Sequence, residues 1–108
     1  MTRYLLNSAV MAPGCYGRYE YLKKDLKFAA EWLKKGHFES RIGYPSLAAL
    51  IEAEFGVEID VNRSIAKFEP GDECLVFRIP YRVGVQAKGE MSQIPLKQYE
   101  IGLIRYYG

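Results

Sequence analysis

The stretch that decides the fold is CLVFRI, residues 74–79, the most apolar run of the chain after YLL at residues 4–6. Short apolar runs bounded by turn residues are typical of strands buried on both faces of a sheet. The run at residues 74–79 comes shortly after Pro-Gly-Asp at residues 70–72, a sequence that favours a turn. We therefore expect residues 4–6 and 74–79 to form central strands.

Other segments show weaker strand patterns on either side of these two runs. Alternating or β-branched and aromatic residues predict three further strands, at residues 18–22, 65–68 and 99–107. Residues 37–41 are either a strand or an extended link, and residues 57–63 alternate only weakly. Glycines and polar residues predict loops at residues 11–17 and 83–93, and we expect a helical turn at residues 96–100.

Two segments carry helix signals at both ends. Asp25 is a suitable N-cap for a helix that runs to Lys35 and ends at Gly36. A second helix begins around Pro45 and stops at Gly56. The residues expected to face the core are Leu26, Ala29, Ala30 and Leu33, with Phe28 and Trp32 beside them, and Leu47, Leu50, Ile51 and Phe55. Residues 1–108 are thus predicted to be a single α/β domain, with a mixed sheet of about five strands and two main helices.

Composition narrows the class of protein. The chain has 108 residues and a net charge of +2, which is too weak for a protein that binds duplex nucleic acid by covering its phosphates. No apolar run is as long as a membrane span and no charged-then-apolar leader opens the chain, so we expect a cytoplasmic protein without membrane association. Two cysteines, Cys15 and Cys74, are too few for a disulfide scaffold. The sequence favours two free buried thiols, with a single disulfide as the alternative.

The start of the second helix is the first candidate site. Gly43 allows a ligand to approach the backbone closely, and free N–H groups with the positive end of the helix dipole make a helix start favourable for anions. The residue at its mouth is Tyr44, and a tyrosine there favours binding over acid–base catalysis. Arg63, Arg78 and Arg82 fall in or just after strand-like segments, and arginine is a good bidentate partner for phosphate.

Metal and thiol chemistry have little support. His37 is the one histidine, and with Cys15 and Cys74 it lacks the spacing of a metal site. A cysteine–histidine nucleophile pair needs the two side chains side by side, and Cys74 lies inside an apolar strand. We expect neither metal nor cofactor.

The chain resembles the small viral and cellular ring nucleases known as the type III-1 anti-CRISPR family, over nearly its whole length. Each matching segment is short, but their order and spacing together are fairly specific. The segments are YLLNSA at 4–9, IGYPS at 42–46 with FG at 55–56, VNR at 61–63, GDE at 71–73 with the strand leading to YR at 81–82, and the strand at 99–107.

This resemblance implies a homodimer that holds cyclic tetra-adenylate, a second messenger of type III CRISPR immunity, across its two-fold axis. Active members cut the ring without metal: a ribose 2′-hydroxyl attacks the adjacent phosphate, and a histidine protonates the leaving oxygen. Tyr44 stands where that histidine is expected. The acidic residue that follows the arginine matching Arg82 has no clear counterpart, and Glu90 is the nearest carboxylate.

The binding positions that the resemblance carries over are Asn7, Ser46, Asn62, Arg63 and Arg82. Arg78 joins them because residues four apart on one strand share a face. The expected protein is a cyclic-oligoadenylate binder whose cleavage is weak or altered, acting as a sponge, a sensor or a slow phosphodiesterase, in the host cytoplasm if it is viral. The alternative is a protein-binding or nucleic-acid-binding module of a virus or mobile element.

Overall fold

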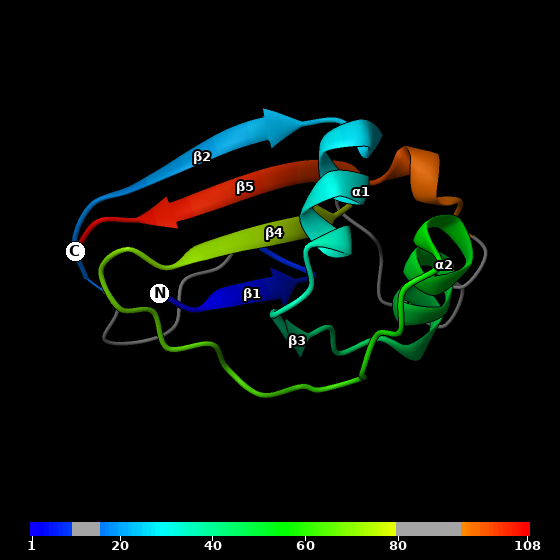
Figure 1. The fold of residues 1–108 in the computed structure, drawn as a ribbon, viewed down its shortest axis with the longest axis horizontal. Helices are drawn as coiled ribbons and strands as arrows, with labels where there is room; N and C mark the ends of the chain where they lie inside the picture. The colour runs from blue at the N-terminus through cyan, green and yellow to red at the C-terminus, as the bar shows by residue number, and fades with distance from the viewer. Residues whose placement is uncertain (10–15, 80–93) are drawn as a thin grey trace.

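The computed structural model describes residues 1–9, 16–79 and 94–108. In these residues, five strands form one mixed sheet in the order β2-β5-β4-β1-β3 (Figure 1). The strands are β1 (Arg3–Leu6), β2 (Tyr19–Lys24), β3 (Glu39–Arg41), β4 (Glu73–Arg78) and β5 (Glu100–Tyr106). β1 pairs in parallel with β3 and β4, whereas β5 is antiparallel to β2 and β4. The two most apolar runs thus form neighbouring interior strands, as predicted.

The helices begin and end where the capping residues indicate. In α1 (Leu26–Lys34), the Asp25 carboxylate accepts a hydrogen bond from the Phe28 N–H at 2.8 Å. α2 (Pro45–Phe55) ends at Gly56, whose φ of 69° lies in the left-handed region that favours glycine. A short 3₁₀ helix, η2 (Leu96–Gln98), forms the helical turn expected before the last strand. None of the helices in the described residues is long and apolar enough to cross a membrane.

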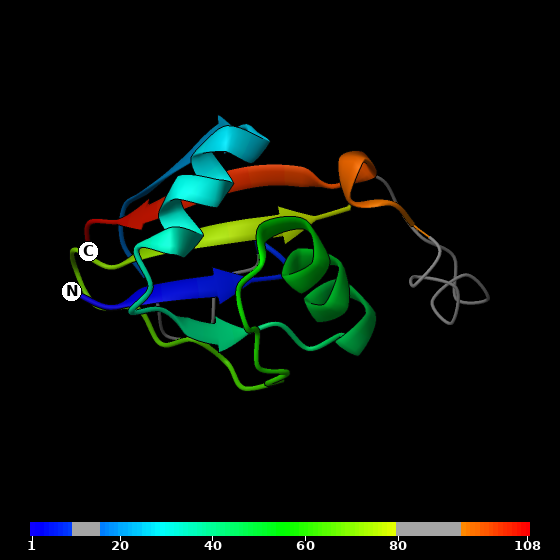
Figure 2. The ribbon, with the colours of Figure 1, turned by 45° about the vertical axis from the view of Figure 1, so that its right-hand side comes forward.

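Both helices lie over the same face of the sheet (Figures 1 and 2). The core between them combines buried residues of the strands, Leu5, Leu75, Phe77 and Leu103, with Ala29, Trp32, Leu33, Leu47 and Ile51 of the helices. The inward face of α1 was predicted wrongly at Leu26, which is 40% exposed, and Ala30 is only half-buried. The buried positions of α1 are Ala29, Trp32 and Leu33. The predicted class, one α/β domain with two main helices and about five strands, is confirmed.

The second face of the sheet is covered in part by a segment that the sequence predicted as a strand. Residues 65–68 form no strand, so that prediction was wrong. Their alternation is nonetheless real: Ala66 and Phe68 are buried against the sheet, and Ile65 is 65% exposed. The segment packs alternate side chains on the face of the sheet, and its backbone does not pair with an edge strand. An extended chain buries every second side chain whether or not its backbone pairs with a strand.

Charged residues of alternating sign face one another across four strands, on the helix-covered face. Arg3 of β1 is in register with Glu73 of β4, Glu73 with Arg105 of β5, and Arg105 with Glu20 of β2. Opposite charges at directly paired positions stabilise a sheet, and like charges there destabilise it. A slip of one strand by one residue would break this order, so the charges favour the observed register.

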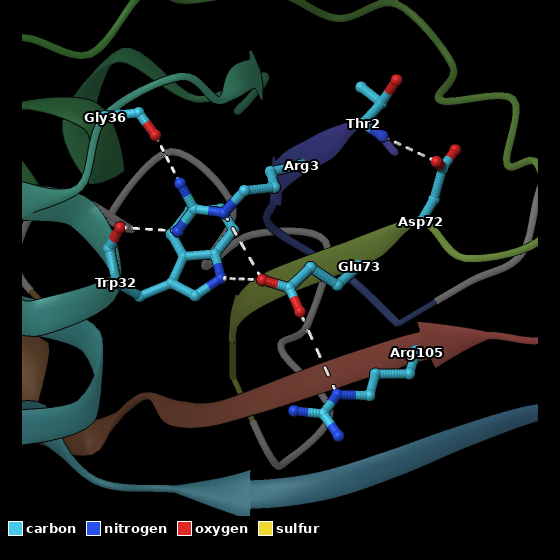
Figure 3. A network of polar contacts seen from close by, with 7 residues as sticks. All are labelled: Thr2, Arg3, Trp32, Gly36, Asp72, Glu73 and Arg105. Carbon is cyan, nitrogen blue, oxygen red and sulfur yellow. Dashed lines mark hydrogen bonds and ion pairs between the residues drawn. The ribbon is translucent and has the colours of Figure 1, made fainter.

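The centre of this row joins the sheet to α1 (Figure 3). Glu73 Oε1 accepts a hydrogen bond from the Trp32 indole at 2.9 Å and pairs with Arg3 Nε at 3.4 Å. Arg3 also donates to the backbone carbonyls of Trp32, at 2.7 Å, and of Gly36, and its Cζ lies 4.0 Å from the Trp32 ring centroid. The last turn of α1 is thereby attached to the first residue of β1.

We predict that Glu73→Ala lowers the free energy of unfolding by about 2–4 kcal/mol, because it leaves the Trp32 indole N–H without an acceptor and the largely buried Arg3 without its carboxylate. Denaturant unfolding followed by the fluorescence of Trp32, the single tryptophan, measures this. Glu58→Ala, at an exposed position, is the control and should change stability by less than about 0.5 kcal/mol. Equal effects of the two substitutions would contradict a structural role for the network.

Candidate ligand-binding site

The carboxyl ends of the parallel strands β1, β3 and β4 lie side by side near the start of α2 (Figure 1). This C-terminal edge of the parallel strands runs across the strand ends. Asn7 follows β1 directly, and Ile42 and Gly43 link β3 to α2. Open sheets that contain parallel strands bind ligands preferentially at this edge. Several of the residues implicated by sequence therefore come from distant parts of the chain to one place.

Asn7 and Gly43 are joined directly. The Gly43 N–H donates to Asn7 Oδ1 at 3.0 Å. With its oxygen occupied by this bond, the side-chain amide of Asn7 offers its NH₂ group as a donor. The contact also connects the end of β1 to the start of α2.

Arg63 also contacts Gly43, at its carbonyl group and along its Cα. Its Nε donates to the Gly43 carbonyl at 2.7 Å, and its Cζ lies 5.5 Å from the ring centroid of Tyr44. A Cβ atom at position 43 would lie 2.9 Å from Arg63 Cγ, so the close approach requires glycine. No ion pair joins Arg63 to a carboxylate in the part of the chain that the structure describes.

A parallel bridge holds the segment of Arg63 in place. Ile42 and Val61 form an isolated bridge, and the Asn62 N–H donates to the Ile42 carbonyl at 2.8 Å. Asn62 Oδ1 accepts from the Ser64 N–H at 3.0 Å. Asn62 therefore shapes the backbone beside the site, a role that the resemblance did not indicate.

The start of α2 leaves donors available. Tyr44 is the N-cap residue, its side chain makes no capping hydrogen bond, and Pro45 occupies the first turn. By helix geometry, the N–H groups of Ser46 and Leu47 have no acceptor within the helix, and the first turn contains no acidic residue. Asn7, Tyr44 and Arg63 thus gather around Gly43, with the backbone of Asn62 and the first turn of α2 beside them. The group is rich in donors and poor in acceptors.

Arg78 belongs to a different cluster. It lies on the same face of β4 as Cys74 and Val76, which face away from the helices. Arg78 Nε pairs with Glu100 Oε2 at 2.6 Å, and the same oxygen accepts from the Tyr21 hydroxyl at 2.8 Å. The structure does not unite Arg78 with the residues around Gly43.

Sequence reasoning missed Tyr21 and Glu100. They meet Arg78 through the pairing of β5 with β2 and β4, and that register has no local signal. The hydrogen bond from Arg78 is the main cause that lowers the pKa of Glu100, and burial is the main cause that raises the pKa of Tyr21, followed by its bond to Glu100.

We predict that the Arg78–Glu100 pair makes stability depend on acid pH. A carboxyl whose folded pKa is depressed stabilises the fold above its unfolded value, and this contribution is lost as pH falls through the folded pKa. Wild type should therefore lose stability below the ordinary glutamate value of 4.5, and the advantage of wild type over Glu100→Gln should shrink there. Urea unfolding at a series of pH values measures this difference, and a constant difference between pH 7 and pH 3 would contradict it.

The thiol and metal candidates can be compared with the structure only in the described residues. Cys74 is a free and fully buried thiol, as expected, and burial raises its pKa. The described residues contain no group of three or more metal-binding side chains. Cys15, Arg82, Glu90 and most of the two predicted loops lie outside the described residues.

The fold and this edge define a small α/β domain with a polar cluster where parallel strands meet a helix start. The chain belongs to the STIV B116-like family, whose model matches residues 3–107. Among solved structures it is similar to B116 of Sulfolobus turreted icosahedral virus, with 18% identity and a TM-score of 0.71, over 97% of this chain and 99% of that one. At this identity the likeness shows the fold alone. No curated protein matches the chain.

Proposed function

We propose that this protein is a dimeric cyclic-oligoadenylate-binding protein that takes cyclic tetra-adenylate and acts on type III CRISPR signalling in the cytoplasm. The observation that carries the proposal is the gathering of Asn7, Tyr44 and Arg63 around Gly43 at the start of α2. Membership of the STIV B116-like family and the resemblance to ring nucleases support it.

The chemistry of the cluster suits a phosphodiester. The terminal nitrogens of Arg63, the amide NH₂ of Asn7 and the first N–H groups of α2 are all donors, and charge-assisted donors recognise phosphate oxygens well. The net charge of +2 is weak for a duplex but sufficient for a ligand with four phosphates, because a small anion needs only local donors. Ser46 and Asn62 lie beside the cluster and complete the proposed binding set with Arg82.

Cleavage, where it occurs, needs no metal in this proposal. The ribose 2′-hydroxyl gives up its proton to water and its oxygen forms a bond to the neighbouring phosphorus, while the bond from phosphorus to the 5′-oxygen breaks. The 5′-oxygen takes up a proton, and the products are a 2′,3′-cyclic phosphate and a 5′-hydroxyl. The protein contributes by holding the 2′-oxygen, phosphorus and leaving oxygen in line. Proton supply to the leaving oxygen is poor, because a phenol is a weak acid near neutral pH. We therefore propose a slow phosphodiesterase.

Dimerisation follows from the symmetry of the ligand. A ring with four equivalent phosphates fits a two-fold axis, which presents the same donors from each chain. We expect sedimentation velocity to show a dimer at micromolar concentration before ligand is added. A monomer that persists after addition of cyclic tetra-adenylate would contradict this prediction.

A thermal-shift screen tests the proposed ligand. Cyclic oligoadenylates of different ring size are compared with linear tetra-adenylate and a short DNA duplex at equal phosphate concentration. A ligand present at 100 times its dissociation constant should add about 2.7 kcal/mol of stability by mass action, so cyclic tetra-adenylate should raise the melting temperature by several degrees. Stabilisation by the duplex alone would favour the alternative of a nucleic-acid-binding module.

A further inference from the structure

We propose that Tyr44 is a positioning residue that works through its ring: together with the Gly43 carbonyl, the ring holds the Arg63 guanidinium ready for a phosphate. This inference rests on the proposed function for the identity of the ligand. The role assigned to Tyr44 depends on its aromatic ring and not on its hydroxyl, and it explains why an aromatic residue occupies this helix start.

Three contacts restrain Arg63. Its Nε donates to the Gly43 carbonyl at 2.7 Å, which orients the plane of the guanidinium. Its Cζ lies over the Tyr44 ring, 5.5 Å from the centroid, within the range of a cation–π interaction. Its stem crosses Gly43 so closely that a Cβ atom there would lie 2.9 Å from Cγ. An exposed arginine is otherwise mobile, and these contacts restrict it before a ligand arrives.

The ring of Tyr44 is itself held in place. Tyr44 is partly buried and packs against the core on the helix-covered face, and its backbone has the extended conformation of an N-cap residue. Within the described residues, no hydrogen bond to the Tyr44 hydroxyl is formed, and the side chain does not cap the helix. The ring of Tyr44 makes the contacts with the core, and these contacts hold in place the aromatic face that lies under Arg63.

This arrangement leaves the useful edge of Arg63 available. Nε is bonded to Gly43, whereas the two terminal nitrogens have no acceptor in the described residues. A guanidinium that is already oriented loses less freedom when it binds, which raises affinity without any new contact to the ligand. The Tyr44 ring should therefore contribute to affinity through Arg63 alone.

The test compares Tyr44→Phe, which keeps the ring, with Tyr44→Leu, which removes it. The first readout needs no ligand: the Arg63 Nε–H resonance of the free protein, assigned by its absence in Arg63→Ala. In wild type we expect a slowly exchanging resonance shifted by the ring. We expect it in Tyr44→Phe as well, and we expect Tyr44→Leu to lose both the shift and the protection while its melting curve remains cooperative.

The second readout is affinity for cyclic tetra-adenylate by calorimetry. Tyr44→Leu should bind about 3- to 30-fold more weakly than wild type, the range expected for a lost cation–π contact. Tyr44→Phe should bind with the affinity of wild type. In the double variant with Arg63→Ala, the leucine should add no further weakening, because its effect passes through Arg63.

Each outcome decides the inference. A Nε–H resonance that is the same in Tyr44→Leu and wild type would overturn it, and so would a Tyr44→Phe variant that behaves like Tyr44→Leu. Additive losses in the double variant would also overturn it. If the resonances behave as expected and no variant binds any cyclic oligoadenylate, the positioning of Arg63 stands and the proposed ligand falls.

Discussion

Tyr44→His is expected to raise the rate of cyclic tetra-adenylate cleavage by about 10²- to 10⁴-fold, the usual contribution of general acid catalysis. An imidazolium is partly populated near neutral pH and releases its proton readily to a leaving oxygen. The position already lies beside Arg63 at the start of α2, so the new group would stand next to the bound phosphate. Because an imidazolium does not attract the Arg63 guanidinium as the phenol ring does, binding should weaken while the chemical step becomes faster. Single-turnover cleavage of labelled ligand, with enzyme in excess, measures the chemical step.

The matched control is Tyr19→His, the same substitution at an exposed position of β2. It should leave the cleavage rate at the wild-type level, because β2 lies at the opposite edge of the sheet from β3. Rapid cleavage by wild type would contradict the account of Tyr44, since another group would then supply the proton. A Tyr44→His variant that binds the ring but cuts it no faster would contradict it as well.

Arg63→Ala is expected to weaken binding of cyclic tetra-adenylate by about 1.5–3 kcal/mol, the value of a charged hydrogen bond. This corresponds to about a 10- to 150-fold rise in the dissociation constant. Folding should change little, because Arg63 is exposed. From the resemblance, we expect Arg82→Ala to act in the same direction. Calorimetric titration at fixed salt concentration provides the measurement.

Arg18→Ala removes an exposed arginine outside the candidate site and serves as the control for net charge. If Arg63→Ala and Arg18→Ala weaken binding equally, the effect is general attraction and not a contact. Normal binding by Arg63→Ala would remove Arg63 from the site altogether.

The sequence predicted those parts of the fold that depend on local signals. Asp25 and Gly56 mark helix ends through bonds and backbone angles that involve only their near neighbours, and both helices were located correctly. The two apolar runs were correctly placed inside the sheet, because strands buried on both faces are made almost entirely of apolar residues. Strand order could not be predicted, because it depends on which distant segments pair and no local pattern records this.

The errors arose where tertiary contacts outweighed pattern. Alternation at residues 65–68 reported correctly which side chains are buried, but it could not show that the backbone would find no strand to pair with. Leu26 fits an inward face by spacing alone, yet it is exposed, whereas Trp32 is buried and donates a hydrogen bond to Glu73. Both cases needed knowledge of residues far along the chain.

The sequence named candidate residues for a site, and it gave no information on how they are arranged. The resemblance indicated Asn7 and Arg63, but nothing in the sequence linked either to Gly43, and their contacts span 36 and 20 residues. Arg78 was grouped with them by spacing, whereas its pairing with Glu100 arises from the register of β4 and β5. Residue type indicated the chemistry, and only the fold showed which of these groups lie together.

Calorimetric titration of cyclic tetra-adenylate into the wild-type protein tests the central claim most directly, because one curve reports both affinity and stoichiometry. We expect saturable binding with one ring for every two chains, and much weaker binding of linear tetra-adenylate at the same concentration. Absence of saturable binding by the cyclic ligand, with a protein that unfolds cooperatively, would contradict it, and so would saturation at one ring for each chain.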